Sequence, residues 1–377
     1  MLFLLLMGVG GFCILQQILY KKYWNRKLGI VARFETHAVY EGDTAFLREE
    51  ITNDKLLPLP VLEVNLAVDR ALKFSGEAKE NANVTDQSYR RDIFSLFARQ
   101  KVIRRLPFVC GKRGYYELRK ADVIGYDFFF RKSFHDDRMF RTSIFVYPKP
   151  VDSRRIALLC RAISGMTATE QRVFPDPFCF SGIRDYRPSD PMHQINWKAS
   201  AKGQGLLVNQ FDATTDIRMK LILDTEDTGM IRRDKLNEEG IRIVASLASR
   251  LVKGRMEVTV SGNGMGQVHL KEGAGQIQRL YEELARIDIY RKTERICGEL
   301  WREKKELMAN VIYVIVSMNR DKETKRAIAS LAEKGNSVLW VIPVDSAKLA
   351  GEAAPCEGVR KFKESVGIRI FQWEMEG

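Results

Sequence analysis

The chain has 377 residues, of which 45% are hydrophobic and 29% are charged. This length and composition are typical of a folded protein of two or three domains and exclude an intrinsically disordered chain. The formal net charge is +13, and residues 101–150 alone hold twelve Lys and Arg against five Asp and Glu. Such an excess can attract an anionic membrane or a nucleic acid, but no basic-aromatic binding motif accompanies it. A solvated basic face is therefore the favoured interpretation, and we expect no nucleic-acid partner.

The cysteines and histidines give no framework for a disulfide scaffold or a zinc site. The six cysteines are scattered along the chain without a Cys-x-x-Cys pair, which favours reduced thiols. The four histidines are far apart in sequence, so no metal-ligand spacing is formed.

The N-terminal residues 1–20 carry no charged side chain and are apolar apart from Gln16, Gln17 and Tyr20. Their number is close to the roughly 20 residues that cross the hydrocarbon core of a bilayer. A signal peptide would begin with basic residues and end with a small-residue cleavage site, and neither is present. A basic segment at residues 21–29 follows. The positive-inside rule then predicts one transmembrane helix at the cell (cytoplasmic) membrane, with lipid around it and the bulk of the chain in the cytoplasm.

Residues 30–148 are predicted to form a β-sandwich domain. Short alternating runs are separated by Gly, Pro, Asn and Asp, which is typical of this architecture. The less regular stretch 71–89 is expected to be a loop. The expected strands lie at residues 30–40, 45–51, 61–68, 102–109, 114–124 and 142–147. A connector at residues 149–180, with a helix at 153–163, joins this domain to the rest of the chain.

From residue 217 onward, strand and helix patterns alternate. Near-continuous apolar strands are expected at residues 217–223, 256–260, 311–316 and 338–344, with a shorter one at 268–270. Amphipathic helices are expected between them at residues 233–252, 275–289 and 322–333. This alternation predicts a Rossmann-type α/β domain over residues 181–377, with a parallel sheet covered on both faces.

The run at residues 178–208 fits neither a helical nor a strand period. Two prolines flank Asp190, which argues for a rigid turn. Arg184 and Arg187 lie close enough to Asp190 in sequence to pair with it locally.

This run resembles the signature of the bacterial membrane protein family catalogued as domain of unknown function fifty-eight. The family pattern is roughly Gly-x-Arg-x-Tyr, Pro-Gly-Asp, Ile-x-Trp-Lys and Ser-Ala-Arg, and the chain departs from it at Ser189, His193 and Lys202. The resemblance implies that the α/β domain is of the von Willebrand factor A-like type. It also implies partners, namely a MoxR-type AAA+ ATPase and other von Willebrand factor A-like proteins. The matching residues are Gly182, Arg184, Tyr186, Pro188, Asp190, Ile195, Trp197, Lys198, Ser200 and Ala201.

Two interpretations of the signature run stay open. Its polar and aromatic side chains could bind acidic groups of a partner, or they could form an internal network that holds the loop to the sheet. We favour the internal network, because Ile195 and Trp197 are spaced by two residues and such a pair suits burial. The partner-binding candidates are Gly182, Arg184, Tyr186, Arg187, Asp190, Trp197 and Lys198.

Domains of the von Willebrand factor A-like type often carry a metal site, Asp-x-Ser-x-Ser, after their first strand. The matching positions are Asp224, Glu226 and Thr228, and oxygen ligands of this kind suit magnesium. Glu226 replaces a hydroxyl with a carboxylate, and no acid directly follows the strand at residues 311–316. We expect a strand-end loop whose acids are solvated or cap the next helix, and no cofactor. A degenerate magnesium site using Asp224 and Thr228 is the alternative.

No motif indicates catalysis. The glycine-rich stretch 261–266 follows a strand but precedes a second strand, so it predicts a turn and not a dinucleotide site. Phosphate loops, nucleophile elbows and zinc-protease motifs do not occur. We therefore predict a membrane-anchored, cytoplasm-facing interaction protein that is not an enzyme and assists the assembly or activation of a complex. The alternatives are a metal-dependent ligand binder through Asp224 and Thr228, and a binder of anionic surfaces through residues 101–150.

Overall fold

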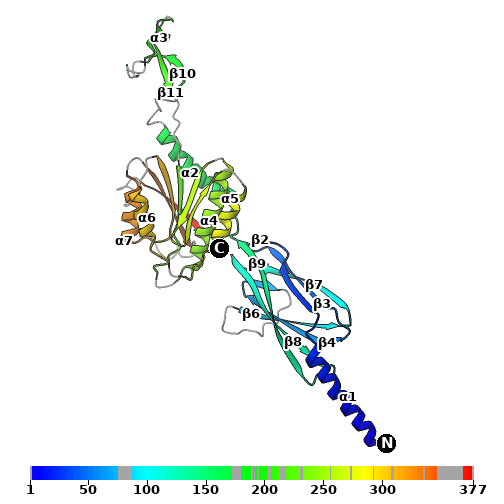
Figure 1. The fold of residues 1–377 in the computed structure, drawn as a ribbon. Helices are drawn as coiled ribbons and strands as arrows, with labels where there is room; N and C mark the ends of the chain where they lie inside the picture. Colours follow the sequence, from blue (N-terminus) through cyan, green and yellow to red (C-terminus); the bar gives the residue numbers. More distant parts are fainter. Residues whose placement is uncertain are drawn as a thin grey trace. The chain divides into compact units, whose positions relative to one another are not determined.

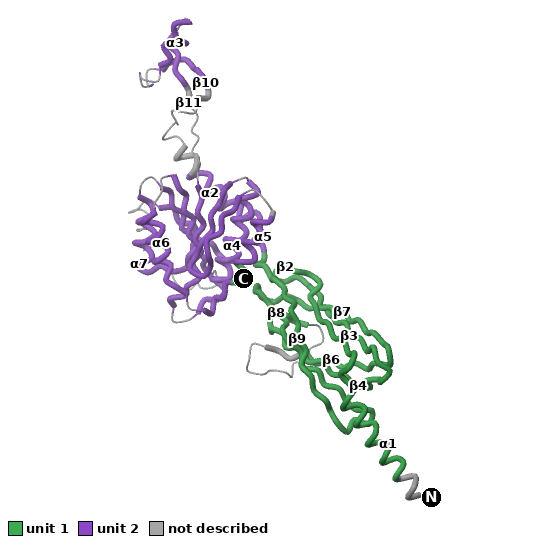
Figure 2. Tube along the Cα trace, in the orientation of Figure 1, with its two compact units in different colours: residues 1–149, 284–286 green, residues 150–283, 287–377 purple. Residues whose placement is uncertain are grey.

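The computed structural model describes residues 2–74, 87–171, 180–187, 190, 192, 195–202, 205–211, 218–229, 232–254, 256–271, 274–291, 293–306, 310–333, 336–345 and 368–375. These residues form seven helices and seventeen strands, and the strands are distributed over four sheets (Figure 1). The chain divides into two compact units (Figure 2). Unit 1 comprises Met1–Lys149 and Leu284–Arg286, and unit 2 comprises Pro150–Glu283 and Ile287–Gly377.

Unit 1 consists of a helix followed by two β-sheets. One sheet has the strand order β1-β3-β7-β5 and the other β2-β9-β8-β4-β6. Neighbouring strands are antiparallel, except that β2 and β9 run parallel. The elements are α1 (Leu2–Tyr23), β1 (Leu28–Phe34), β2 (Ala38–Tyr40), β3 (Thr44–Asn53), β4 (Leu59–Asp69), β5 (Leu72–Phe74), β6 (Gln87–Leu96), β7 (Gln100–Cys110), β8 (Gly114–Tyr126) and β9 (Ser133–Tyr147).

The two sheets of unit 1 share one hydrophobic core. Alternate residues of β3, among them Leu47 and Ile51, point inward. They meet Leu62 and Leu66 of β4 and Ile144 of β9, which belong to the other sheet. Burial of each such side chain contributes roughly 1.5–3 kcal/mol. The alternation along the strands is thus what holds the two sheets face to face.

The C-terminal part of α1 packs against the sheets of unit 1. The Tyr20 hydroxyl donates a hydrogen bond of 2.8 Å to the backbone carbonyl of Pro58. The ring of Trp24, just after the helix, stacks on Phe134 with 6.1 Å between ring centroids. Tyr20 and Trp24 are both buried. The end of the helix is therefore part of the core of unit 1.

No helix in the described part of the chain is long and apolar enough to cross a membrane. The transmembrane helix predicted at residues 1–20 and the predicted localisation as a single-pass membrane protein are therefore wrong. A physical reason lies in the polar side chains of α1. Gln16 is buried and donates a hydrogen bond of 2.8 Å to Asp127 of unit 1, and Lys21 and Lys22 lie in the last turn of the helix.

Unit 2 contains a six-stranded sheet with the order β14-β13-β12-β15-β16-β17 and a separate β10-β11 pair. Within the six-stranded sheet, β14 is antiparallel to β13 and the other neighbours are parallel. The elements are α2 (Ser153–Gln171), β10 (Phe180–Asp185), α3 (Trp197–Ser200), β11 (Leu207–Phe211), β12 (Arg218–Leu223), α4 (Asp234–Lys253), β13 (Val258–Gly262), β14 (Met265–Leu270), α5 (Ala274–Arg286, except for Leu284–Arg286, which are assigned to unit 1), α6 (Ile296–Lys305), β15 (Val311–Val316), α7 (Lys322–Leu331), β16 (Ser337–Asp345) and β17 (Arg369–Met375).

Helices cover both faces of the six-stranded sheet. Ile315 of β15 packs in one cluster with α6 and α7. The next residue, Val316, faces the opposite side, where a Cβ on Gly240 of α4 would lie 3.5 Å from its side chain. Strand β15 is buried at every position, as expected for a parallel strand between two helical layers. The chain enters the sheet at β12 and winds in both directions from it, so β12 and β15 form the topological switch point.

The fold class predicted from the sequence is wrong as stated. It combined an α/β domain of the von Willebrand factor A-like type with a β-sandwich domain and one transmembrane helix. The described residues are richer in strands than in helices, with four separate sheets, and none of their helices can span a membrane. The observed architecture is a two-sheet β unit and a unit with a doubly wound sheet.

Candidate functional site

Asp224 is the first residue after β12 and lies at the switch point of the six-stranded sheet. Its backbone N–H donates a hydrogen bond of 2.9 Å to the carbonyl of Val316, the last residue of β15. The carboxyl ends of β12 and β15 therefore meet at Asp224. In doubly wound sheets, ligands bind outside the carboxyl ends of the strands at this point.

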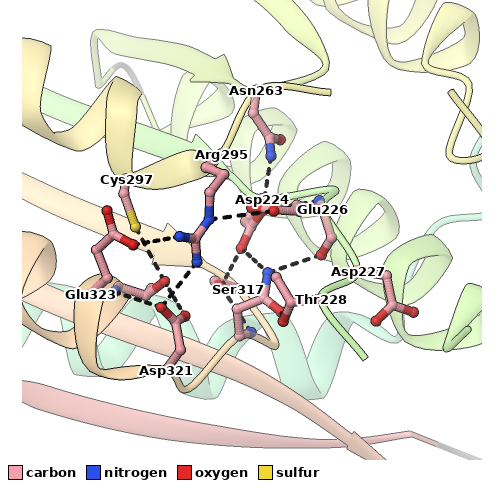
Figure 3. Close-up of polar contacts among 12 residues, drawn as sticks. Asp224, Glu226, Asp227, Thr228, Asn263, Arg295, Cys297, Ser317, Asp321 and Glu323 are labelled. Carbon is pink, nitrogen blue, oxygen red and sulfur yellow. Dashed lines mark hydrogen bonds and ion pairs between the residues drawn. The ribbon is translucent and has the colours of Figure 1, made fainter. Parts of the chain in front are cut away.

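The carboxylate of Asp224 accepts four hydrogen bonds from the protein (Figure 3). Oδ1 accepts from the backbone N–H of Glu226 and from Nδ2 of Asn263, each at 3.0 Å. Oδ2 accepts from Oγ of Ser317 at 2.6 Å and from Nδ2 of Asn319 at 2.9 Å. A carboxylate offers about four lone-pair positions. Protein donors thus fill the hydrogen-bonding capacity of this group.

Asp224 is only 4% exposed. Burial raises the pKa of its carboxyl above the ordinary value, and the hydrogen bonds from Ser317, Glu226, Asn319 and Asn263 act in the opposite direction. Burial, followed by the nearby charge of Asp224, also raises the pKa of Glu226. The site is therefore an acidic group held in place by neutral donors.

Asn319 joins the two residues predicted as metal ligands. Its Nδ2 donates to Asp224 and, at 2.9 Å, to the backbone carbonyl of Glu226. Its Oδ1 accepts a hydrogen bond of 2.8 Å from the hydroxyl of Thr228. Asp224 and Thr228 are thus connected through an amide instead of facing a common ion position. A hard cation needs oxygen ligands around it, whereas here a nitrogen donor stands between the oxygens of Asp224 and Glu226.

Asp227, the third acid of the loop, holds the segment that leads into α4. Its carboxylate accepts a hydrogen bond of 3.0 Å from the guanidinium of Arg233 and one of 3.0 Å from the backbone N–H of Gly229. Burial acts to raise the pKa of Asp227, but the backbone and side-chain hydrogen bonds from Arg233 and Gly229 outweigh it and hold the pKa below its ordinary value. The role of Asp227 is therefore local and structural.

A second acidic cluster lies beside the site. The ligand atoms of Cys297, Asp321 and Glu323 lie within 4.8 Å of one another. The guanidinium of Arg295 pairs with both carboxylates, at 3.2 Å from Asp321, and lies 3.7 Å from Glu226 (Figure 3). Burial raises the pKa of the Cys297 thiol, which disfavours the thiolate that a metal would need. The Arg295 cation is thus the counter-charge of this cluster.

The glycine-rich stretch 261–266 contains the end of β13, the turn at residues 263–264 and the start of β14, so the predicted turn between two strands is confirmed. A Cβ on Gly262 would lie 2.3 Å from the backbone oxygen of Leu223. The absence of a side chain therefore lets β13 approach the end of β12 closely. Asn263 in the turn accepts hydrogen bonds of 2.9 and 3.0 Å from the N–H and hydroxyl of Thr225. The turn is part of the network around Asp224.

Sequence reasoning did not identify Asn263, Ser317 or Asn319 as site residues. Ser317 directly follows β15 and Asn319 lies two residues further on, so their position at a strand end was the signal that could have identified them. Asn263 directly follows β13 and so carried the same strand-end signal, but its contact with Asp224 depends on the strand order of the tertiary fold.

In the signature run, Arg184 and Asp190 form a bidentate ion pair. The guanidinium nitrogens of Arg184 donate to the two carboxylate oxygens at 2.7 and 2.8 Å. The backbone N–H of Arg187 donates to Asp190 at 2.9 Å. Arg184 and then Arg187 lower the pKa of Asp190 to about 2. The predicted local pairing is confirmed for Arg184 and Asp190, whereas Arg187 contacts Asp190 through its backbone N–H.

The other candidates in this run take different positions. Trp197 is 64% exposed, whereas Ile195 is 6% exposed, so the expectation that both are buried is wrong for Trp197. Lys198 is also exposed. Gly182 lies in β10 opposite Gln210 of β11. Tyr186 donates its backbone N–H to the carbonyl of Leu206 at 2.9 Å. The signature positions Pro188, Ser189 and His193 lie outside the described residues.

Half of the twelve cations of residues 101–150 form ion pairs within unit 1. Arg104 pairs with Asp92 at 2.7 Å and Arg105 with Glu35 at 2.7 Å. Cations of this segment that form ion pairs with carboxylates are Lys101, Arg104, Arg105, Arg119, Lys120 and Arg138. A cation that already has a partner contributes less to the binding of an external anion.

No family model matches the chain, and no curated protein matches it. One solved structure that matches is the CARDB domain of the PF1109 protein from Pyrococcus furiosus in complex with di-metal ions. It is 10% identical, covers 32% of this chain and 88% of its own, and has a TM-score of 0.21. At that TM-score the likeness carries no argument about fold or function. The resemblance to the family of unknown function stays a prediction.

Proposed function

We propose that the chain is a non-catalytic interaction protein that works with a MoxR-type AAA+ ATPase in the assembly or activation of a protein complex. The observation that supports a non-catalytic role is the saturated carboxylate of Asp224 at the switch point. A general base needs a lone pair within reach of a substrate proton, and a metal ligand needs one directed at the ion. Asp224 directs its lone pairs at protein donors.

The hydroxyl of the neighbouring Ser317 is likewise hydrogen-bonded within the protein. Ser317 is buried, its Oγ donates to Asp224, and the same oxygen accepts the backbone N–H of Asn319 at 3.1 Å. A nucleophilic serine needs an accessible oxygen beside a base that can take its proton. The geometry around Ser317 instead supports a structural role, in which the loops after β12 and β15 are tied together.

A metal-dependent ligand binder is the second candidate, and one specific observation favours it. Nδ2 of Asn319 lies 2.9 Å both from Oδ2 of Asp224 and from the carbonyl oxygen of Glu226. Two hard oxygens therefore converge on one atom, and a rotation of the Asn319 side chain would leave them facing a common position. Magnesium accepts ligands of this type.

Binding to the purified ATPase tests the first proposal. The full chain is titrated against a MoxR-type ATPase from the same cells, with and without ATP, and an unrelated AAA+ ATPase serves as the negative control. Asp224→Asn is the matched variant, because it keeps the shape of the side chain but places an NH2 group against donors. We expect this variant to be less stable than the wild type but still to bind the ATPase. Failure of the wild type to bind at micromolar concentrations would contradict the proposal.

A further inference from the structure

We propose that Trp197 and Lys198 form the centre of a docking surface for a partner protein that presents an apolar pocket rimmed by carboxylates. The inference rests on the proposed interaction role and specifies the surface and the partner chemistry. The surface belongs to a small module, called the signature module here, that consists of β10, residues 195–202 with α3, and β11.

The signature module holds the backbone of Trp197 in one conformation. Ile195 forms a β-bridge with Val208, and both side chains are buried. Asn196 caps α3 by accepting the N–H of Ala199 at 2.9 Å. Its Nδ2 donates to Asn209 of β11 at 2.7 Å. Trp197 is the first residue after this doubly anchored cap, so little backbone entropy is lost when it binds a partner.

Two further contacts close the module. Oγ of Ser200 accepts the backbone N–H of Leu207 at 2.8 Å and donates to the carbonyl of Asn196 at 2.9 Å. The ion pair of Arg184 and Asp190 braces the segment that follows β10. Among the described residues, these contacts involve Arg184, Asp190, Asn196, Ser200 and Asn209, and the indole of Trp197 makes no hydrogen bond or ring contact.

The exposed indole of Trp197 offers a large apolar surface to a partner. A tryptophan buries roughly 150–250 Å² of surface when it is covered, and tryptophan is enriched among the residues that dominate binding energy at protein interfaces. Met192, Ile183 and Leu206 of the same run are exposed as well. An apolar anchor on a pre-organised backbone is the arrangement expected of an interface hot spot.

The charges around the indole of Trp197 indicate the charge of the partner surface. Arg187, Lys198 and Lys202 are exposed and Asp185 is the exposed acid, while Arg184 is neutralised by Asp190. The exposed side chains thus carry a positive excess, which fits an acidic protein surface. Nucleic acid would require a longer row of unpaired cations along its phosphates, so an acidic protein is the better match.

The first test is a matched pair of tryptophan substitutions in the full chain. Trp197→Ala should weaken binding to the MoxR-type ATPase by about tenfold or more. Trp301→Ala removes a 39% exposed tryptophan on α6 and should leave the affinity unchanged. Circular dichroism and melting curves should match the wild type for Trp197→Ala, since this side chain supports no core. Equal affinities of both variants would overturn the inference.

The second test addresses charge. Lys198→Glu should slow association and lower the affinity, with an effect that shrinks as salt is raised. Lys235→Glu changes an exposed lysine on α4 by the same amount of charge and should have little effect. An equal loss for both variants would show that only the net charge matters and would contradict a specific surface.

A third arm separates this inference from the proposed function. If the wild type does not bind the ATPase, the partner named above is wrong, and p-benzoylphenylalanine in place of Trp197 is then cross-linked in cells. Capture of one acidic protein, lost when Lys198→Glu is added, would support the docking surface. Cross-links to nucleic acid, to the rest of this chain, or to nothing at all would overturn it.

Discussion

Nδ2 of Asn319 donates a hydrogen bond of 2.9 Å to Oδ2 of Asp224. This contact joins the loops that follow the two central strands of the sheet, β12 and β15. The same nitrogen holds the carbonyl of Glu226, and the Oδ1 of Asn319 holds the hydroxyl of Thr228. One amide therefore connects every residue that the sequence proposed as part of a metal site.

Asn319→Ala should lower the free energy of unfolding by about 1–3 kcal/mol, because it removes a donor from a buried carboxylate. Thr228→Val is the control, since it removes only one hydrogen bond from an exposed side chain and should cost less than about 1 kcal/mol. Urea unfolding followed by tryptophan fluorescence measures both, because Trp340 and Trp373 are buried in unit 2. Equal losses would show that the amide is not the central link.

Magnesium should not raise the melting temperature of the wild type at millimolar concentration. The lone pairs that would bind the ion are occupied by protein donors at Asp224, and each of those hydrogen bonds would have to break. Thermal shift with magnesium, and with calcium as a larger hard ion, measures this. An increase that disappears in Asp224→Ala would favour the metal-dependent alternative.

Helices and strands could be predicted from the sequence where their apolar pattern lies within one segment. The strand predicted at residues 311–316 coincides with β15, and the helix predicted at 233–252 corresponds to α4. Both carry their apolar pattern within a single segment. Strand β5 falls in the stretch predicted as a loop, and β17 was not predicted, although it follows β16 in the sheet.

The site was less predictable because its contacts are not local. Asp224 was identified as a strand-end acid, but its donors Asn263 and Asn319 come from other strand ends, and only the strand order brings them together. Trp197 was expected to be buried from its spacing to Ile195. This inference fails because Trp197 begins a short helix. The two-residue alternation of a strand ends before it and does not place its side chain on the side of Ile195.

Gly262→Ala should destabilise unit 2 by about 3 kcal/mol or more, because the new Cβ would lie 2.3 Å from the backbone oxygen of Leu223, and backbone cannot yield as a flexible side chain can. Gly266→Ala is the matched control on β14, with no atom within 4 Å of its Cβ. The same urea measurement should show little change for the control. Similar stability for both variants would mean that β12 and β13 separate easily at this end.

Glu49 of β3 is an unusual member of the core of unit 1. It is 3% exposed, and neither carboxylate oxygen has a hydrogen-bond partner among the described residues. The charged groups that act on it are Asp92, Arg90 and Arg104. Both arginines bind Asp92, at 2.8 and 2.7 Å. Burial, and then the charge of Asp92, raises the pKa of Glu49 from 4.5 to about 7.

This shift fixes the direction of the pH dependence. The folded state binds the proton of Glu49 more tightly than the unfolded state does, so the stabilisation is complete below pH 4.5 and is lost as the pH rises through about 7. The loss amounts to about 3 kcal/mol for a shift of this size. The free energy of unfolding of unit 1 should therefore decrease as the pH rises from weakly acidic to weakly alkaline values.

Glu49→Gln should remove this dependence and make unit 1 more stable than the wild type at pH 8, because a neutral amide replaces a buried charge. Glu50→Gln is the control on the same strand. A hydrogen bond from Lys101 lowers the pKa of Glu50, so this variant should lose stability at pH 8. Urea unfolding is measured at several pH values from 5 to 8. Each sample is then pulse-labelled with deuterium at one fixed pH, and the deuterium uptake of the backbone amides of β3 reports the fraction of unit 1 that is unfolded. A wild-type stability that rises over this range, or an unchanged slope in Glu49→Gln, would exclude Glu49 as the titrating group.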